Sequence, residues 1–466
     1  MPRPSDQILT AAQMRSAEEA LIAGGTSVDQ LMQRAGRGAA EWVWRAAAGR
    51  AVTVLCGPGN NGGDGYVIAE AVRERGGEAA VVAAVEPKTA AAQNARASYR
   101  GEVLGPEAAT HGSVLVDCLF GTGLARPLSG DHLTLLVQLA QSHPYRIAVD
   151  LPSGVASDSG MLLNADLPSY DFTLALGAWK FAHWLMPASA RMGALRLVPI
   201  GVEAVDGAAR VIGRPRLAAP APDAHKYRRG LIVVIAGQMP GAALLAAQAA
   251  QRAGAGYVKL LAKRAVAAPA DLVTDAQPLA EALADTRIAA LLIGPGLGRH
   301  AEARERLAVA LASGIPAVLD ADALVLLGAR QLAERSAPLI ATPHEGELAA
   351  LERALDCVAV GSKPERTAAL AMASGMIVVA KGPDTVIATP DGRIACAPRS
   401  SSWLSVAGTG DVLAGTIASR LATGLDPFTA ACEGVWLHGE AARLARPAFT
   451  ASQLAAMIRS AYATCL

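Results

Sequence analysis

Short runs of apolar residues alternate along the chain with stretches of helical spacing, and this alternation limits the possible folds more than any other feature. Apolar residues recur at helical intervals in residues 66–75 and 133–140. Alternating strands and helices predict a parallel sheet covered on both faces. We therefore expect the first half to be a doubly wound, Rossmann-like three-layer α/β/α domain. Its predicted strands are residues 51–56, 79–85, 113–118, 146–150 and 171–176.

The alternation stops and then restarts, which predicts two domains. Residues 213–229 are rich in proline and have no apolar periodicity, as is typical of a linker. We expect one α/β domain in residues 1–212 and a second doubly wound α/β domain in residues 230–466. The predicted strands of the second are residues 231–236, 257–262, 288–293, 317–320, 338–341 and 376–380, followed by a hairpin of residues 385–388 and 393–397.

Composition excludes several classes of protein. The chain has 42 Lys and Arg against 41 Asp and Glu, for a net charge of +1, and 4% aromatic residues, so nucleic-acid binding is not expected. Its six cysteines are scattered without metal-type spacing, which indicates free thiols in a reducing compartment. The longest uncharged run, residues 231–251, is interrupted by glycine, proline and glutamine and predicts a strand, loop and helix rather than a membrane span. We expect a cytoplasmic protein that binds no membrane.

A segment with five glycines, residues 57–65, follows the first predicted strand. We expect it to be a loop before the next helix, in which glycines let backbone N–H groups converge on a ligand. A tight strand–helix turn is the plain alternative. The adjacent Asn60 and Asn61 and the embedded Asp64 exceed what a turn needs, so the segment is predicted to be functional.

Acidic residues and a lysine follow the other strands at the same expected edge of the sheet, where open α/β sheets bind ligands. Asn61, Asp117 and Ser153 carry side-chain oxygens, which suit a hard cation of low charge. Asp150 and Lys180 could form a proton-transfer pair, because a buried lysine readily shifts its pKa. A simple surface position for Lys180 is equally compatible with the sequence.

The segments GPGNNGGDG, VDCLFGTGLARP, AVDLPSG and TLALGAWK occur in the order seen in the YjeF N-terminal family, the NAD(P)H-hydrate epimerases, which residues 10–212 resemble. The resemblance implies interconversion of the R and S forms of hydrated NADH and NADPH (NADHX and NADPHX), with K⁺ held by Asn61, Asp117 and Ser153. Some family members are non-catalytic binding modules. The implied substrate contacts are Asn60, Asn61, Gly62, Gly63, Asp64, Gly121, Thr122, Gly123, Leu124, Ala125, Arg126, Pro127 and Asp150.

The second half of the chain also places glycine-rich and polar segments at the ends of its predicted strands. A glycine loop, residues 294–298, follows one strand, and Asp320-Ala321-Asp322 ends another. Residues 342–347 bring an imidazole and two carboxylates to a third strand end. Near the end of the chain, Gly408-Thr409-Gly410-Asp411 opens a helix whose free N–H groups form an anion hole. An aspartate there can steer a hydroxyl toward a phosphoryl group, so Asp411 is the predicted key residue.

The segments HKYRRGLIVVIAG, GPGLG, TPHEGE and AGTGDVLAG resemble the ribokinase-like ADP- or ATP-dependent NAD(P)H-hydrate dehydratases over residues 220–460. The resemblance implies a ribokinase-like fold in which Ala242, Gly296, His344 and Asp411 contact the hydrated nucleotide. Mg²⁺ would accompany ADP or ATP. Two departures from the family pattern are Gly237-Gln238 and residues 400–405, SSSWLS, which leave the loop over the nucleotide open. The implied ADP or ATP contacts are Lys381, Gly382, Pro383, Asp384, Thr385 and Gly410.

Together the two resemblances predict a bifunctional enzyme with Asp150 and Lys180 catalytic in the first domain and Asp411 in the second. ADP is the weakly favoured donor, and a homo-oligomer is expected. The main alternative is a ribokinase-like small-molecule kinase fused to a non-catalytic YjeF N-terminal module. A nicotinamide dehydrogenase is disfavoured, because residues 57–65 are not a clean GxGxxG and no acidic residue clearly ends the second strand.

Overall fold

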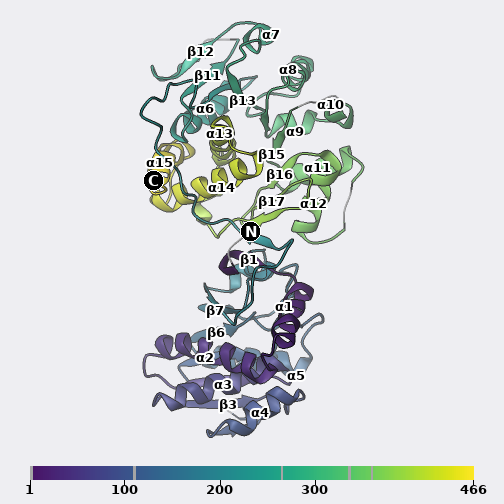
Figure 1. Cartoon of the computed structure of the whole chain (residues 1–466), viewed down its shortest axis with the longest axis vertical. Coiled ribbons are helices and arrows are strands. Elements are labelled where there is room, and N and C mark those ends of the chain that lie inside the picture. Colours follow the sequence, from purple (N-terminus) through teal and green to yellow (C-terminus); the bar gives the residue numbers. More distant parts are fainter. Residues whose placement is uncertain (1–3, 109–111, 264–265, 334–336, 358–359) are drawn as a thin grey trace. The chain divides into compact units, whose positions relative to one another are not determined.

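The computed structural model describes residues 4–108, 112–263, 266–333, 337–357 and 360–466 (Figure 1). The chain divides into two compact units, Met1–Arg210 and Val211–Leu466. Each unit contains a largely parallel sheet with helices on both faces, so the expected pair of α/β domains is confirmed. The linker and the exact domain bounds predicted from sequence stay a prediction.

A parallel sheet of seven strands forms the middle layer of the first unit in the part of the chain that the structure describes. The strands lie in the order β4-β3-β2-β5-β6-β7-β8, and each neighbouring pair is parallel. Their bounds are β2 (Val52–Cys56), β3 (Ala79–Ala83), β4 (Val103–Leu104), β5 (Val114–Cys118), β6 (Tyr145–Val149), β7 (Phe172–Leu176) and β8 (Ala194–Val198).

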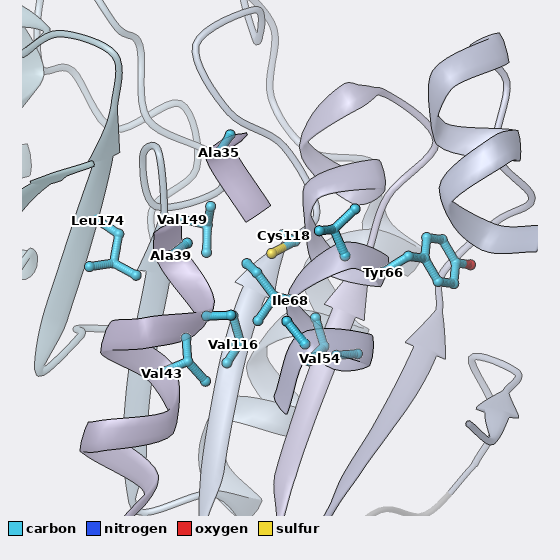
Figure 2. Close-up of a cluster of buried hydrophobic side chains, with 14 of the residues drawn as sticks. Ala35, Ala39, Val43, Val54, Tyr66, Ile68, Val116, Cys118, Val149 and Leu174 are labelled. Atoms are coloured by element: carbon cyan, nitrogen blue, oxygen red, sulfur yellow. The ribbon is translucent and has the colours of Figure 1, made fainter. Parts of the chain in front are cut away.

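Helices cover both faces of this sheet, so its central strands are buried on both sides. Val54 points to the face covered by α2 and α3, where it joins the cluster drawn in Figure 2. Leu55, the next residue, packs on the opposite face with Leu136 of α5. The helices are α1 (Ala11–Ala23), α2 (Val28–Ala47), α3 (Asn60–Glu74), α4 (Ala90–Ser98) and α5 (Gly130–Ser142), with short 3₁₀ turns at η1 (Pro4–Asp6), η2 (Phe181–His183) and η3 (Ala188–Arg191).

The N-terminal segment is tied to the end of β7. Strand β1 (Gln7–Ile8) pairs antiparallel with β9 (Ala209–Val211) through Ile8–Ala209 and Gln7–Arg210. The Leu9 N–H donates to the Trp179 carbonyl at 2.8 Å. The chain that leads into α1 is therefore fixed beside the loop that carries Lys180.

The second unit has a mixed sheet in the order β18-β17-β16-β15-β14-β13-β10-β11-β12. Its neighbouring pairs are parallel from β16 to β12, and β17 and β18 form the predicted antiparallel hairpin. The strands are β10 (Leu231–Ile235), β11 (Tyr257–Leu261), β12 (Val273–Asp275), β13 (Ile288–Ile293), β14 (Ala317–Leu319), β15 (Leu339–Ala341), β16 (Ile377–Ala380), β17 (Val386–Ala388) and β18 (Ile394–Cys396).

The two faces of this second sheet also carry different helices. Val234 packs with Ile417 and Ala246 on the face covered by α6 and α13, while Val233 packs with Leu307 and Leu348 on the face of α8 and α11. The helices are α6 (Pro240–Arg252), α7 (Leu279–Ala282), α8 (Ala301–Ala312), α9 (Asp322–Leu326), α10 (Ala329–Ala333), α11 (Glu345–Ala354), α12 (Lys363–Ser374), η4 (Ser402–Leu404), α13 (Thr409–Ala422), α14 (Pro427–Leu444) and α15 (Ala451–Ala463).

The sequence-based strands are confirmed, and residues 231–251 form β10, a loop and α6 as expected. No helix of the described residues has the length and apolar character needed to cross a membrane. The sequence analysis missed the strand Ala194–Val198, at the edge of the first sheet, because most of its residues are exposed or half-buried and it lacks a buried apolar run.

The expectation that residues 57–65 form a loop before the helix is wrong, because α3 already begins at Asn60. The glycines serve close packing of this helix on the strand ends. A Cβ on Gly62 would lie 1.9 Å from the Gly57 carbonyl oxygen, and one on Gly65 would lie 2.7 Å from the Cys56 sulfur. Backbone from β2, α3 and β5 therefore meets at distances that only glycine permits.

Gly62→Ala should destabilise the protein, although alanine normally favours a helix. The added methyl must displace the backbone at Gly57, an overpacking cost of about 1–3 kcal/mol. Gly130→Ala is the matched control, because Gly130 also lies in a helix, α5, and a Cβ there meets nothing within 4 Å. Urea unfolding of both variants tests this, and equal midpoints would contradict the packing role.

Candidate functional sites

The first candidate site lies at the carboxyl ends of β6 and β7, where Asp150 meets Lys180. The Lys180 ammonium contacts an Asp150 carboxylate oxygen at 2.5 Å and donates to the Leu176 carbonyl at 2.7 Å. Lys180 is 1% exposed and Asp150 is 7% exposed, so the surface-lysine interpretation is wrong. The structure thus brings this predicted pair into direct contact.

The backbone and its neighbours hold Asp150 in one position. Its φ is +66°, a conformation that costs energy for a residue other than glycine and recurs at functional sites. The Thr122 amide and hydroxyl both donate to the second carboxylate oxygen, at 2.8 and 2.5 Å. Burial alone would raise the pKa of Asp150, but the Lys180 charge and these hydrogen bonds outweigh it, so the pKa is lowered and the carboxylate is ionised.

The pKa of a second carboxyl group in the same site is shifted in the opposite direction. Asp64, in the first turns of α3, is buried, and this burial raises its pKa well above the usual value, with the charges of Asp150 and Glu18 adding to the shift. The pKa of Glu18, on α1, is also raised, first by burial. Two carboxyl groups with pKa values driven apart are the arrangement from which a proton donor and a proton acceptor are built.

Asp117 and Ser153 form a separate buried cluster beside the pair. The Asp117 carboxylate accepts from the Ser153 hydroxyl at 2.7 Å, the Ser153 amide at 3.0 Å and the Tyr170 hydroxyl at 2.5 Å, and also from the Leu119 amide. These partners are all neutral, and burial raises the pKa of Asp117. Both polar side-chain atoms of Asn61 are buried with no hydrogen-bond partner among the described residues.

The loop after β5 reaches the same site through Gly121. A Cβ there would lie 2.8 Å from an Asp150 carboxylate oxygen and 3.3 Å from the Asn61 side chain. Asn61, Gly121, Thr122 and Asp150 therefore lie together as predicted. The residues further along the loop, Gly123, Ala125, Arg126 and Pro127, are exposed, and their contact with a substrate stays a prediction.

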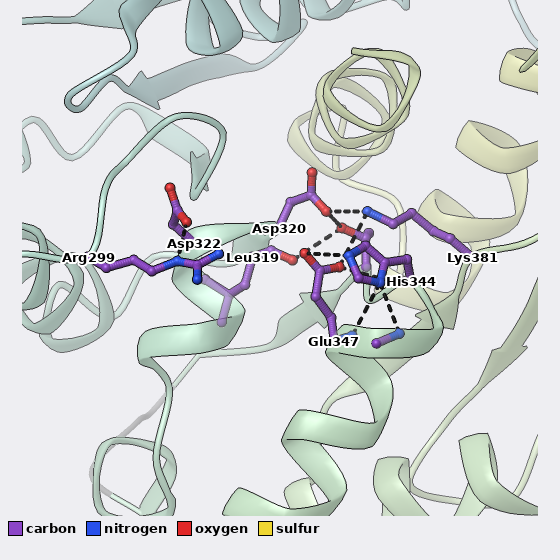
Figure 3. A network of polar contacts seen from close by, with 9 residues as sticks. Arg299, Leu319, Asp320, Asp322, His344, Glu347 and Lys381 are labelled. Carbon is purple, nitrogen blue, oxygen red and sulfur yellow. Dashed lines mark hydrogen bonds and ion pairs between the residues drawn. The ribbon is translucent and has the colours of Figure 1, made fainter. Parts of the chain in front are cut away.

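The second candidate site lies at the carboxyl ends of β14, β15 and β16 (Figure 3). The Lys381 ammonium contacts the Asp320 carboxylate at 2.6 Å, and the Thr342 hydroxyl donates to the same oxygen at 2.7 Å. Asp320 is 1% exposed. Glu347, at 3.9 Å, adds a second carboxylate near the lysine.

The predicted anion hole faces this lysine. A Cβ on Gly410 would lie 3.5 Å from the Lys381 nitrogen, so a phosphate there would meet both the ammonium and the N-terminus of α13. Burial raises the pKa of Asp411 to about 6, with the Asp320 charge adding to the shift and the Lys381 charge opposing it. Asp411 is therefore mostly ionised at neutral pH yet readily protonated, as a general base should be.

His344 is not a core histidine, because its side chain is 62% exposed. Its Nδ1 accepts from the Gly346 and Glu347 amides and so caps α11, while the Glu347 carboxylate accepts from the His344 amide at 2.9 Å. The cap fixes the ring at the strand end, and contact of the ring with a substrate stays a prediction.

The segment from Lys381 to Thr385 is held by a residue that the sequence analysis missed. The Lys363 ammonium, at the start of α12, contacts the Asp384 carboxylate at 2.6 Å and donates to the Lys381 carbonyl at 3.3 Å. Nothing in the sequence marks Lys363 or Glu18 as site residues, since both stand in ordinary helical patterns. The sequence does mark Asp320 as a candidate, because it follows a strand, as Asp150 does.

Each unit therefore sets a buried acid–lysine pair at the carboxyl edge of its sheet, which defines the class of protein: a two-domain α/β enzyme with a site in each domain. Residues 28–182 match the family described as YjeF-related protein N-terminus, and residues 232–463 match the family described as NAD(P)H-hydrate dehydratase. The chain belongs to the family of bifunctional NAD(P)H-hydrate repair enzymes.

Individual relatives cover nearly the whole chain. The bifunctional NAD(P)H-hydrate repair enzyme of Gloeobacter violaceus is 35% identical over 93% of this chain and 92% of its own length. The Mycobacterium leprae enzyme is 33% identical, with 93% of both chains covered. A solved ADP/ATP-dependent NAD(P)H-hydrate dehydratase from Bacillus subtilis, co-crystallised with ATP/Mg²⁺, is 27% identical and covers 54% of this chain and 95% of its own, with a TM-score of 0.46.

Proposed function

We propose that this chain repairs hydrated NADH and NADPH with one reaction in each unit. The first unit epimerises the R and S hydrates, and the second dehydrates the S form with ADP or ATP. The observation that carries this proposal is that each matched family region contains one buried acid–lysine pair. The Asp150–Lys180 pair lies within residues 28–182, which match the first family. The Asp320–Lys381 pair lies within residues 232–463, which match the second.

The second site suits a phosphorylation followed by an elimination. Asp411 takes the proton of the ring hydroxyl, and the hydroxyl oxygen attacks the terminal phosphorus of the nucleotide, whose bond to its bridging oxygen breaks. The new phosphate ester then leaves as phosphate, which takes a proton from the neighbouring ring carbon, and the double bond is restored. Lys381 and the N-terminus of α13 hold the negative charge that develops. Mg²⁺ bound with the nucleotide would offset the charge of its phosphates.

The first site suits inversion of the hydroxyl-bearing carbon of the ring by loss of water from one face and its return to the other: a proton is donated to the departing hydroxyl, and a proton is accepted from the water that re-forms the C–O bond. Inverting that carbon requires one group that donates a proton and one that accepts a proton. Asp150 is fixed by Lys180 and Thr122 and its pKa is lowered, while burial raises the pKa of Asp64 well above its usual value. We assign the acceptor role to Asp150 and the donor role to Asp64, and Lys180 fixes the charge and position of Asp150.

A potassium ion is the third element of the proposal. Asn61 has two buried side-chain polar atoms without a partner among the described residues, and Asp117 is a buried carboxylate whose hydrogen-bond donors are neutral. Both observations fit a cation of low charge held by oxygens of Asn61, Asp117 and Ser153. Such an ion would supply positive charge beside Asp150.

Replacing K⁺ with choline in the buffer should slow epimerisation and leave the rate of dehydration of pure S hydrate nearly unchanged. In Asn61→Ala, which removes the side chain without partners, the K⁺ concentration for half-maximal epimerisation should rise about tenfold or more. Titration of epimerase activity with KCl at constant ionic strength measures this. Epimerisation that is independent of K⁺ in the wild type would remove the ion from the proposal.

Two aspartate variants should separate the reactions. Asp411→Asn should reduce dehydration of S hydrate by about 10²-fold or more, because the amide cannot accept the hydroxyl proton, and should leave epimerisation intact. Asp150→Asn should do the reverse. Each variant is the control for the other, and chromatography of separated R and S hydrates reads both reactions. Loss of both activities in either folded variant would contradict the division of labour.

Dehydration should also depend on pH through Asp411. Its pKa of about 6 means that the carboxylate is available above pH 6 and is lost as the pH falls. The rate constant for dehydration at low S-hydrate concentration should therefore be level between pH 7 and 8 and drop about tenfold per unit below about pH 6. A stopped-time assay over pH 5–8 measures this, and an unchanged rate at pH 5 would exclude Asp411 as the base.

The rival function, a small-molecule kinase fused to a non-catalytic module, predicts a stable phosphorylated product and no epimerase activity. The GTGD turn of residues 408–411 is compatible with a kinase, but the buried pair of Asp150 and Lys180 in the first unit favours catalysis there. A cytoplasmic location, a homo-oligomeric state, the absence of nucleic-acid binding and the preference for ADP stay predictions.

A further inference from the structure

If the proposed function is right, the second site must hold two polyanions at once. These are the adenine nucleotide and the hydrated dinucleotide. Lys381, together with Gly410, lies where a phosphate of the adenine nucleotide is expected. The dinucleotide carries a pyrophosphate of its own, and hydrated NADPH carries a 2′-phosphate as well. A site that binds both molecules needs cationic groups on the dinucleotide side, which none of the residues considered so far supplies.

Arg299 directly follows the glycine loop of residues 294–298, whose Gly296 is implied by the family resemblance to contact the hydrated dinucleotide. Its Nε donates to one Asp322 carboxylate oxygen at 2.8 Å, and the Gly298 amide donates to the other at 2.9 Å. The carboxylate thereby joins the guanidinium to the backbone of the glycine loop. Figure 3 shows Arg299 reaching toward Asp322 while Lys381 reaches Asp320 from the other side.

The loop itself is fixed by close contacts, so the guanidinium is held by a rigid support. A Cβ on Gly237 would lie 2.3 Å from Leu297, and the Met239 amide donates to the Gly296 carbonyl at 2.9 Å. The Arg304 guanidinium donates to the Arg299 carbonyl at 3.1 Å, which brings a second positive charge to the same turn.

The two terminal amino groups of Arg299, which bind anions best, are available to a ligand. Among the described residues, no hydrogen bond engages its two terminal amino groups, and its side chain is 64% exposed. A guanidinium bound through Nε to a carboxylate still presents these two groups as a planar fork, which matches two oxygens of a phosphate.

We propose that Arg299 binds a phosphate group of the hydrated dinucleotide and thereby holds this substrate against the glycine loop. The partner is either the pyrophosphate that both hydrates share or the 2′-phosphate found in hydrated NADPH. Asp322 is the positioning residue that aims the fork.

The experiment measures steady-state dehydration of S-NADHX and of S-NADPHX by full-length wild type and Arg299→Ala. The variant should raise KM for hydrate about tenfold or more and leave KM for ADP and the epimerase rate unchanged. An equal rise for both hydrates assigns the pyrophosphate, and a rise confined to NADPHX assigns the 2′-phosphate. Arg287→Ala is the matched control, because Arg287 makes a similar exposed pair with Asp285 in the same unit.

Two results would overturn the proposal while wild type is active: KM values for both hydrates within twofold of wild type, or a rise in KM for ADP instead. A rise of the same size in Arg287→Ala would also overturn it, since the effect would then be one of general surface charge. If wild type dehydrates neither hydrate with ADP or ATP, the proposed function itself fails, so the two failures are distinguishable.

Discussion

A buried carboxylate paired with a lysine at the carboxyl edge of a parallel sheet is the interaction on which both sites depend. Asp150 meets Lys180 at 2.5 Å in the first unit, and Asp320 meets Lys381 at 2.6 Å in the second. An unpaired charge at such depth would be strongly unfavourable, so each partner requires the other. The backbone is strained at both points, with φ of +66° at Asp150 and +47° at Ala321. Such strain recurs at functional sites, and here it stands at Asp150 itself and at the residue after Asp320.

The strand ends could be predicted from the sequence because they follow from local apolar runs. The sequence left two positions open for Lys180, the pair with Asp150 and the surface, and the structure shows the pair. Parallel strands direct their carboxyl ends to one edge, so residues far apart in sequence converge there. Lys363 and Glu18 could not be predicted, because their roles depend on which face of a helix packs toward the site. The strand of residues 194–198 was missed for a related reason, since an edge strand lacks the buried run that marks a central one.

The glycine segment after the first strand shows why a motif can be functional for a reason other than the expected one. We expected residues 57–65 to form a loop that offers N–H groups to a ligand, yet most of the segment is helix. Gly62 and Gly65 allow α3 to approach the ends of β2 and β5 more closely than a side chain would permit. That approach places Asn61 and Asp64 in the site, so the glycines act on function through packing.

The near-neutral charge of the chain is compatible with binding of anionic nucleotides, because three cations at the second site are individually paired. Lys381 is matched by Asp320, Lys363 by Asp384 and Arg299 by Asp322, so each of these three cations has its own carboxylate. A phosphate that enters such a site shares a cation that is already positioned, and it meets helix N–H groups that carry no net charge. If these groups bind the two polyanions as proposed, recognition rests on the orientation of a few paired groups. It requires no basic surplus across the surface, in agreement with a net charge of +1.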